Sequence, residues 1–155
     1  MWSGAESSLE KPNWFRDWQL GAAFMVAPVV WTSLYLIDTP PLKLEWVSAA
    51  PLLFLMLILV RPVLEEIVFR GLLQGWSIKQ SWGRESIVGI TYANITISIV
   101  FAALHLMSLT PFMAALVFIP SLVFGYFRDR YNGWLIPGIL LHCFYNAGYF
   151  LLYRP

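Results

Sequence analysis

The sequence predicts an all-α fold, a multi-pass bundle of transmembrane helices with about five spans. The 155 residues are 59% hydrophobic and only 12% charged, whereas average soluble domains are about 25% charged. Apolar stretches of about the length that crosses a bilayer as a helix recur along the chain. Few ionisable residues interrupt these stretches. We therefore expect residues 1–155 to form one integral membrane domain, and the composition excludes a disordered chain, a nucleic-acid partner and an ordinary soluble enzyme.

Five apolar stretches define the expected spans, at about residues 20–37, 46–76, 87–107, 112–127 and 134–153. Segment 46–60 alone is short for a span. We therefore predict one long helix over 46–76, kinked at Pro62 because proline removes a backbone donor; a discontinuous helix is the alternative. Pro40 and Pro41 predict a loop. Residues 77–86 form a polar connection, and 108–111 and 128–133 are expected to be tight turns.

The basic residues between the spans predict the orientation, because Lys and Arg are enriched in cytoplasmic loops. With the N-terminus inside, six basic residues fall on the cytoplasmic side and two, Lys43 and Arg154, fall outside. The six are Lys11, Arg16, Lys79, Arg84, Arg128 and Arg130. The sequence therefore favours a cytoplasmic N-terminus.

The segment RPVLEEIVFRG, residues 61–71, places charges inside an apolar stretch. Charged residues are costly in a membrane, so they indicate a functional site. Glu66 and Arg70 are four residues apart and can pair on one helix face, and Arg61 and Glu65 have the same spacing. Adjacent glutamates point about 100° apart on a helix. One carboxylate can therefore act as a base while the other is a scaffold; the alternative is a purely structural cluster of ion pairs.

Two further apolar stretches contain a histidine. Phe101 and His105 are four residues apart, as are His142 and Asn146, so each pair shares a helix face. A carboxylate and a histidine can polarise water, and His142 with Asn146 could stabilise an oxyanion. An interhelical polar clamp is the alternative for the second pair. We interpret Cys143 as a packing residue. Neither Ser98 nor Ser121 has the sequence pattern of a nucleophile.

A metal-dependent reaction is a further alternative. Two histidines and a glutamate could bind zinc with an open position. The chain contains no HExxH pattern, which is the pattern typical of zinc peptidases. We therefore expect no metal and no cofactor.

Three motifs appear in order, each in its own apolar stretch: EExxxR at Glu65–Arg70, FxxxH at Phe101 to His105 and HxxxN at His142 to Asn146. Over about residues 63–149 the chain resembles the CPBP or Abi family of glutamic-type intramembrane proteases, which is related to the type II CAAX prenyl endopeptidases. The resemblance implies a catalytic core at about 62–150.

The resemblance also implies roles for individual residues. Glu65 would be the general base, helped by His105, and His142 and Asn146 would form the oxyanion site. Supporting roles would fall to Glu66, Arg70 and Phe101. The implied substrate is a membrane-anchored or lipid-modified protein in the cell membrane of a prokaryote, with sorting-signal or precursor processing as specific options.

Two other functions stay open from the residues. A transporter or proton relay could use buried Glu and His, although no internal repeat is detectable and most transporter designs have one. A non-catalytic scaffold or immunity protein could use the same polar residues as a clamp. Depth is a geometric difficulty for the peptidase. Counted along straight helices at about 1.5 Å per residue, Glu65 lies about 18 Å deep, His142 about 14 Å and His105 about 28 Å.

Overall fold

A computed structural model describes residues 14–38 and 44–153, which are almost entirely helical. The elements are a 3-10 helix Trp14–Arg16, α1 Trp18–Asp38, α2 Glu45–Ala49, α3 Pro51–Leu55, the π-helix η2 Met56–Val60, α4 Arg61–Glu65, the π-helix η3 Glu66–Gln74, α5 Gly75–Ser77, α6 Ser81–Arg84, β1 Ser86–Ile87, β2 Ile90–Thr91, α7 Tyr92–His105, α8 Pro111–Arg130 and α9 Ile136–Leu152. The expected loop at Pro40 and Pro41 lies outside the described residues, as do Lys11, Lys43 and Arg154 of the orientation argument.

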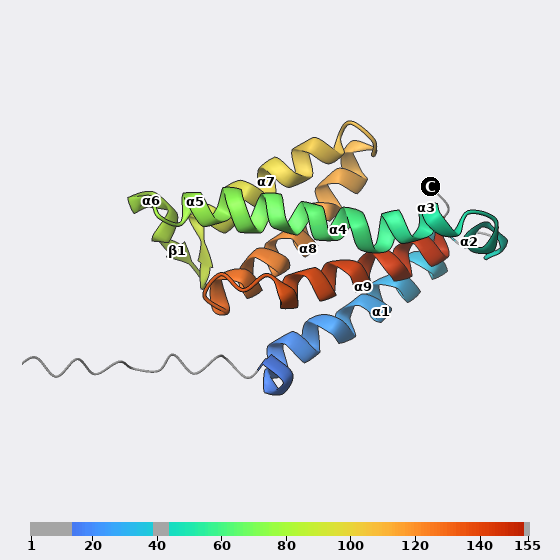
Figure 1. The fold of residues 1–155 in the computed structure, drawn as a ribbon, viewed down its shortest axis with the longest axis horizontal. Coiled ribbons are helices and arrows are strands. Elements are labelled where there is room, and N and C mark those ends of the chain that lie inside the picture. Colours follow the sequence, from blue (N-terminus) through green and yellow to red (C-terminus); the bar gives the residue numbers. More distant parts are fainter. Residues whose placement is uncertain (1–13, 39–43, 154–155) are drawn as a thin grey trace, which may run out of the picture.

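Helix α9 lies at the centre of the bundle. It packs against α1, α8, η2 and α4, and α7 packs along α8 as a hairpin (Figure 1). A buried apolar cluster joins α1, α8 and α9; it consists of Leu20, Phe124, Phe127, Tyr131 and Leu141. Because α9 contacts α1, α8 and the 51–77 segment, side chains on its faces can meet residues from several helices at once.

The helical segment over 51–77 consists of α3, η2, α4, η3 and α5 in unbroken succession. It begins later than expected, because Ala50 leaves the helical region at φ −136° and Pro51 starts the next helix. Residues Glu45–Ala49 therefore form a separate short helix. No break occurs at Pro62. The π-helical turn Met56–Val60 ends two residues before Pro62, and the long segment contains a second π-helix, Glu66–Gln74.

The prediction of a helix over 87–107 is wrong at its N-terminal end. Residues 86–91 form a small antiparallel hairpin in which Ile87 pairs with Ile90. Val88 and Gly89 both have positive φ, at 52° and 78°, the conformation that two-residue hairpin turns require. Helix α7 then begins at Tyr92, where the Thr91 side chain caps it by accepting a hydrogen bond from the Asn94 N–H.

Two helices are long and apolar enough to cross a membrane, Trp18–Ile37 and Pro111–Arg130. Tyr92–His105 and Ile136–Leu152 are apolar but shorter, and the 51–77 segment is divided among α and π pieces. The all-α class is therefore confirmed in the described residues, whereas the predicted number of five spans is not.

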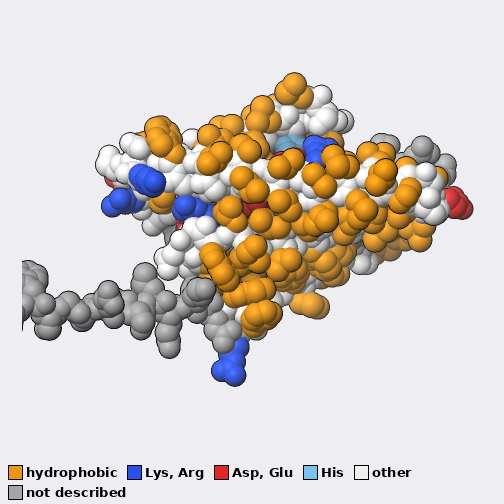
Figure 2. All heavy atoms as spheres, in the orientation of Figure 1, with side chains coloured by type: hydrophobic (Ala, Val, Ile, Leu, Met, Phe, Trp, Pro, Cys, Tyr) orange, Lys and Arg blue, Asp and Glu red, His pale blue; other side chains and the backbone are white. Residues whose placement is uncertain are grey.

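The surface along the length of the helices is mostly apolar, and basic side chains cluster at one end. Figure 2 shows apolar side chains over most of the visible face, with basic side chains gathered at the end where α5 and α6 lie. Exposed large apolar residues occur on several helices, including Met25, Leu59, Leu72, Ile99 and Ile119. Such a continuous apolar surface is unusual for a soluble monomer and indicates contact with a membrane or a partner.

A polar cluster ties the start of α1 to the end of α8. The Asp17 carboxylate accepts hydrogen bonds from Arg130 Nε at 2.6 Å, from the Tyr131 hydroxyl at 2.9 Å and from the Gln19 N–H at 3.0 Å. Burial raises the pKa of Asp17, but these hydrogen bonds outweigh it and the net pKa is lowered. A carboxylate with a lowered pKa stabilises the fold above the pKa of the unfolded chain.

We expect this stabilisation to disappear at low pH. As the pH falls below about 3.9, the ordinary value for aspartate, and then through the lower pKa of the folded protein, Asp17 takes up its proton and the contribution is lost. Thermal unfolding of Asp17→Asn and the unmodified protein should therefore differ most near neutral pH and converge in acid. A difference independent of pH would contradict this assignment.

Candidate active site

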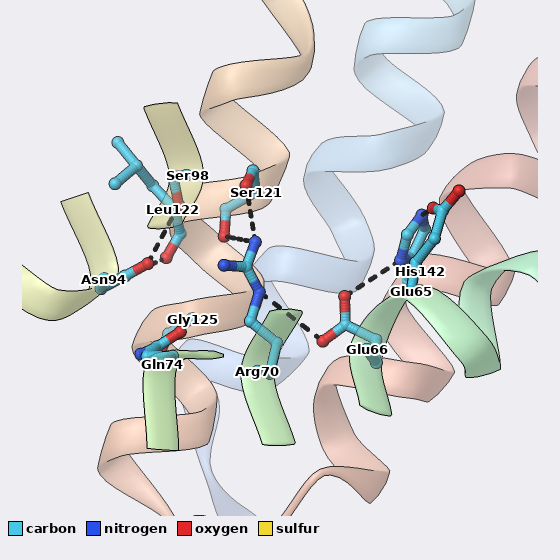
Figure 3. Close-up of polar contacts among 10 residues, drawn as sticks. All are labelled: Glu65, Glu66, Arg70, Gln74, Asn94, Ser98, Ser121, Leu122, Gly125 and His142. Carbon is cyan, nitrogen blue, oxygen red and sulfur yellow. Dashed lines mark hydrogen bonds and ion pairs between the residues drawn. The ribbon is translucent and has the colours of Figure 1, made fainter. Parts of the chain in front are cut away.

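Two adjacent glutamates meet one histidine at the centre of the bundle. Glu65 ends α4 and Glu66 begins η3, and α9 carries His142. His142 Nδ1 lies 3.0 Å from Glu66 Oε1, and its Nε2 lies 3.5 Å from Glu65 Oε2. Figure 3 shows the imidazole close to both carboxylates. The sequence assigns His142, together with Asn146, to an oxyanion site. No motif indicated the contact between His142 and Glu66, which are 76 residues apart in the sequence.

The two glutamates differ in exposure. The Glu65 side chain is 20% exposed and that of Glu66 is 2% exposed. Both predicted i,i+4 pairs form: Arg61 Nη2 lies 3.5 Å from Glu65 Oε1, and Arg70 Nε lies 3.8 Å from Glu66 Oε2. Arg61 is half exposed, whereas Arg70 is fully buried. Glu65 is therefore the carboxylate with access to water or substrate.

Arg70 is held by α8 as well as by Glu66. Its Nη2 donates to the Ser121 hydroxyl at 2.6 Å and to the Ser121 carbonyl at 2.8 Å (Figure 3). The guanidinium also lies 5.7 Å from the Phe101 ring centroid, within the range of a cation–π contact. Ser121, which has no nucleophile pattern in the sequence, thus holds Arg70, the ion-pair partner of Glu66. Its small polar side chain within an apolar stretch was the signal available.

Replacing Ser121 by alanine should destabilise the protein more than the matched change at Ser98. Both serines are fully buried, but the Ser98 hydroxyl donates to the neutral Asn94 amide. A hydrogen bond to a charged group contributes about 1.5–3 kcal/mol and a neutral one about 0.5–1.5 kcal/mol. Chemical unfolding of Ser121→Ala and Ser98→Ala would measure both losses, and equal losses would argue against an anchoring role for Ser121.

Aromatic rings enclose His142. Phe124 of α8 stacks on the imidazole with centroids 4.7 Å apart and planes inclined by 20°. Phe101 of α7 meets the same imidazole edge-on at 6.1 Å and also contacts Phe69 at 4.9 Å. The sequence singled out Phe101 through its motif. It carried no signal for Phe124, whose position depends on the packing of α8 against α9.

His105 hydrogen-bonds to Phe101 and not to Glu65, the residue that it was expected to assist. Its Nδ1 is 2.8 Å from the Phe101 carbonyl oxygen, one turn earlier on α7, and its ring lies 4.6 Å from the Phe101 ring. Within the described part of the chain, no hydrogen bond or ion pair joins His105 to Glu65. Because a carbonyl only accepts, Nδ1 carries a proton, and in the neutral imidazole Nε2 then keeps its lone pair. Phe101 therefore contacts both histidines of the protein.

The shape of the α7–α8 hairpin bears on the difficulty of depth. Figure 1 shows the turn between α7 and α8 beside the middle of the long axis, short of the end formed by α2 and α3. The hairpin is tilted relative to the 51–77 segment. The end of α7, which carries His105, therefore lies part of the way along the bundle, and α7 is not parallel to the 51–77 segment.

Asn146 follows His142 by one turn of α9 and donates from Nδ2 to the Leu57 carbonyl at 3.1 Å. The second hydrogen of the amide remains available. The described residues contain no group of three or more His, Cys, Asp or Glu side chains arranged to hold a metal ion. Metal-free chemistry stays a prediction. What the side chains provide is a partly exposed carboxylate, two imidazoles and an amide donor.

One comparison with known proteins finds a family whose match covers the part of the chain that carries this site. The type II CAAX prenyl endopeptidase Rce1-like family matches residues 46–148. This range includes every candidate site residue and about two thirds of the chain. No curated protein and no solved structure matches the chain. The three motifs and the extent of the match together show that the chain belongs to the type II CAAX prenyl endopeptidase Rce1-like family.

Proposed function

We propose that this protein is an intramembrane endopeptidase in which Glu65 activates water to hydrolyse a peptide bond. The observation that carries the proposal is the placement of His142 against both Glu65 and the buried Glu66. That contact places the more exposed carboxylate beside a buried polar centre. A carboxylate held there can take a proton from water as the water attacks a carbonyl carbon.

The remaining residues supply the other parts of such a reaction. In the neutral imidazole of His105, whose Nδ1 faces a carbonyl, Nε2 is the second acceptor that we assign for a proton of the water. The free amide hydrogen of Asn146 is one donor that we assign to the tetrahedral oxyanion. The other is Nε2 of His142 when it carries a proton, because Nδ1 faces the Glu66 carboxylate. We assign supporting roles to Glu66, Arg70 and Phe101. Glu66 pairs with the buried Arg70, and Arg70 lies over the Phe101 ring.

The substrate that we propose is a membrane-anchored protein with a prenylated CAAX carboxyl terminus or a related lipid-modified segment. The family name describes such a substrate, and the apolar surface would let enzyme and substrate share a bilayer (Figure 2). Processing of a sorting signal or a bacteriocin precursor is the narrower alternative. We further propose a multi-pass protein of a prokaryotic cell membrane with a cytoplasmic N-terminus. Arg84, Arg128 and Arg130 at one end of the fold support this orientation.

A prenylated peptide tests the substrate class directly. The purified protein in bilayers would be incubated with a peptide ending in a farnesylated CAAX sequence and with its unprenylated twin, and fragments would be identified by mass spectrometry. We expect cleavage of the prenylated peptide that Glu65→Gln abolishes. Equal cleavage of both peptides would overturn the substrate proposal, and cleavage that survives in Glu65→Gln would overturn the proposed mechanism.

A further inference from the structure

The π-helical turn before Pro62 leaves one backbone carbonyl without its ordinary donor. In an α-helix the Leu57 carbonyl would accept from the N–H of residue 61. Here the Arg61 N–H donates to Met56, five residues back. In the π-helical pattern the Leu57 carbonyl would accept from residue 62, which is a proline and has no N–H. Neither helical partner is available to the Leu57 carbonyl.

The Asn146 side chain supplies the missing donor to the Leu57 carbonyl. Its Nδ2 donates to the Leu57 carbonyl at 3.1 Å, from one turn beyond His142 on α9. A helix carbonyl left unpaired inside a membrane costs several kcal/mol, so the hydrogen bond from Asn146 stabilises the folded protein. It also fixes which way the Asn146 amide faces, because the oxygen of the amide cannot approach another oxygen acceptor.

We infer that Pro62 is a positioning residue for the reaction, acting through the Leu57 carbonyl on Asn146. Pro62 lies outside all three motifs. By withholding an N–H, it keeps the Leu57 carbonyl as an acceptor for the Asn146 amide. The second amide hydrogen is thereby held in a fixed direction one turn from His142. The bond also sets the register of α9 against the 51–77 segment at the level where His142 meets Glu65 and Glu66.

The substitution Pro62→Ala separates positioning from stability, because the two should change in opposite directions. The alanine brings an N–H to the Leu57 carbonyl, and a proline is removed from a helix interior, so the unfolding midpoint should stay equal or rise. The Asn146 amide loses its exclusive acceptor. We expect kcat to fall about tenfold or more with KM unchanged, as misplacement of a reacting group does.

The double variant Pro62→Ala/Asn146→Ala tests the hydrogen bond between the Asn146 amide and the Leu57 carbonyl without any substrate. In the unmodified protein, Asn146→Ala leaves the Leu57 carbonyl unpaired and should lower the unfolding midpoint clearly. In the Pro62→Ala background the same change should lower it much less, because the N–H introduced at position 62 supplies the donor. If Asn146→Ala fails to fold alone, folding of the double variant supports the pairing, and its failure to fold overturns it.

Pro28 provides the matched control, since it also lies inside a helix, α1. Pro28→Ala should leave kcat unchanged and should not reduce the loss caused by Asn146→Ala. Equal losses from Asn146→Ala in all backgrounds would overturn the pairing, and wild-type kcat in Pro62→Ala would overturn the positioning role. The catalytic half of this inference rests on the proposed function. If the unmodified protein fails to cleave the farnesylated CAAX peptide, the proposed function fails, while the unfolding midpoints still decide the pairing.

Discussion

Glu65→Gln is expected to lower kcat/KM by about 10²–10⁴-fold, the usual contribution of general acid–base catalysis, with little change in the unfolding midpoint. Glutamine has the shape of glutamate but cannot take the proton of the attacking water. The side chain is 20% exposed and its partner Arg61 is 53% exposed, so neutralising it leaves no deeply buried charge. Cleavage rates and thermal unfolding of the purified protein would measure both effects.

Glu45→Gln is the control for this change, because Glu45 is an exposed acid in the first turn of α2. It should leave both the rate and the unfolding midpoint unchanged. Cleavage by Glu65→Gln at the rate of the unmodified protein would remove Glu65 from the reaction. A collapse of the fold in Glu65→Gln would instead assign Glu65 to a structural cluster, which was the alternative left open by the sequence.

Arg70→Ala should cost about 3–5 kcal/mol of unfolding free energy, the loss typical when a buried ion pair is broken from one side. Arg70 is fully buried, and its removal leaves the Glu66 carboxylate facing only His142. Arg61→Ala offers a matched comparison, since Arg61 pairs with Glu65 at the same i,i+4 spacing but is half exposed. Exposed pairs contribute about 0–1 kcal/mol.

A double variant separates a missing partner from a general loss of packing. Glu66→Leu combined with Arg70→Met removes both charges and keeps side-chain volume, so it should recover much of the stability lost in Arg70→Ala. Unfolding in urea or mixed micelles would rank the variants. Equal costs for Arg70→Ala and Arg61→Ala would show that burial of the Glu66–Arg70 pair has no energetic consequence, contrary to our assignment.

The sequence predicted the contacts that are local along a helix. The pairs of Glu66 with Arg70 and of Arg61 with Glu65 follow from a spacing of four residues, and both are present. The motifs also identified His142, but its contact with Glu66 could not be foreseen, because it depends on how α9 packs against the 51–77 segment. Ser121 and Phe124 were missed for the same reason.

Backbone geometry was the second limit of the sequence. Apolar periodicity does not distinguish an α-helix from a π-helix, so η2 and η3 were not expected. The hairpin at 86–91 interrupts an otherwise apolar stretch, and only the glycine at position 89 marked its turn. The predicted number of spans depended on the lengths of apolar stretches. The helices that form within 87–107 and 134–153 are shorter than those stretches, whereas α1 and α8 cover theirs.

The most direct test of the central claim is a comparison of membranes from cells that express the unmodified protein with membranes from cells that express Glu65→Gln. Candidate membrane-anchored proteins would be co-expressed with each, and their fragments identified by mass spectrometry, after confirming that both proteins are folded and inserted. The account predicts a fragment that appears only with the unmodified protein and identifies the hydrolysed bond. Identical fragments with both proteins across a broad panel would contradict it and favour a non-catalytic scaffold.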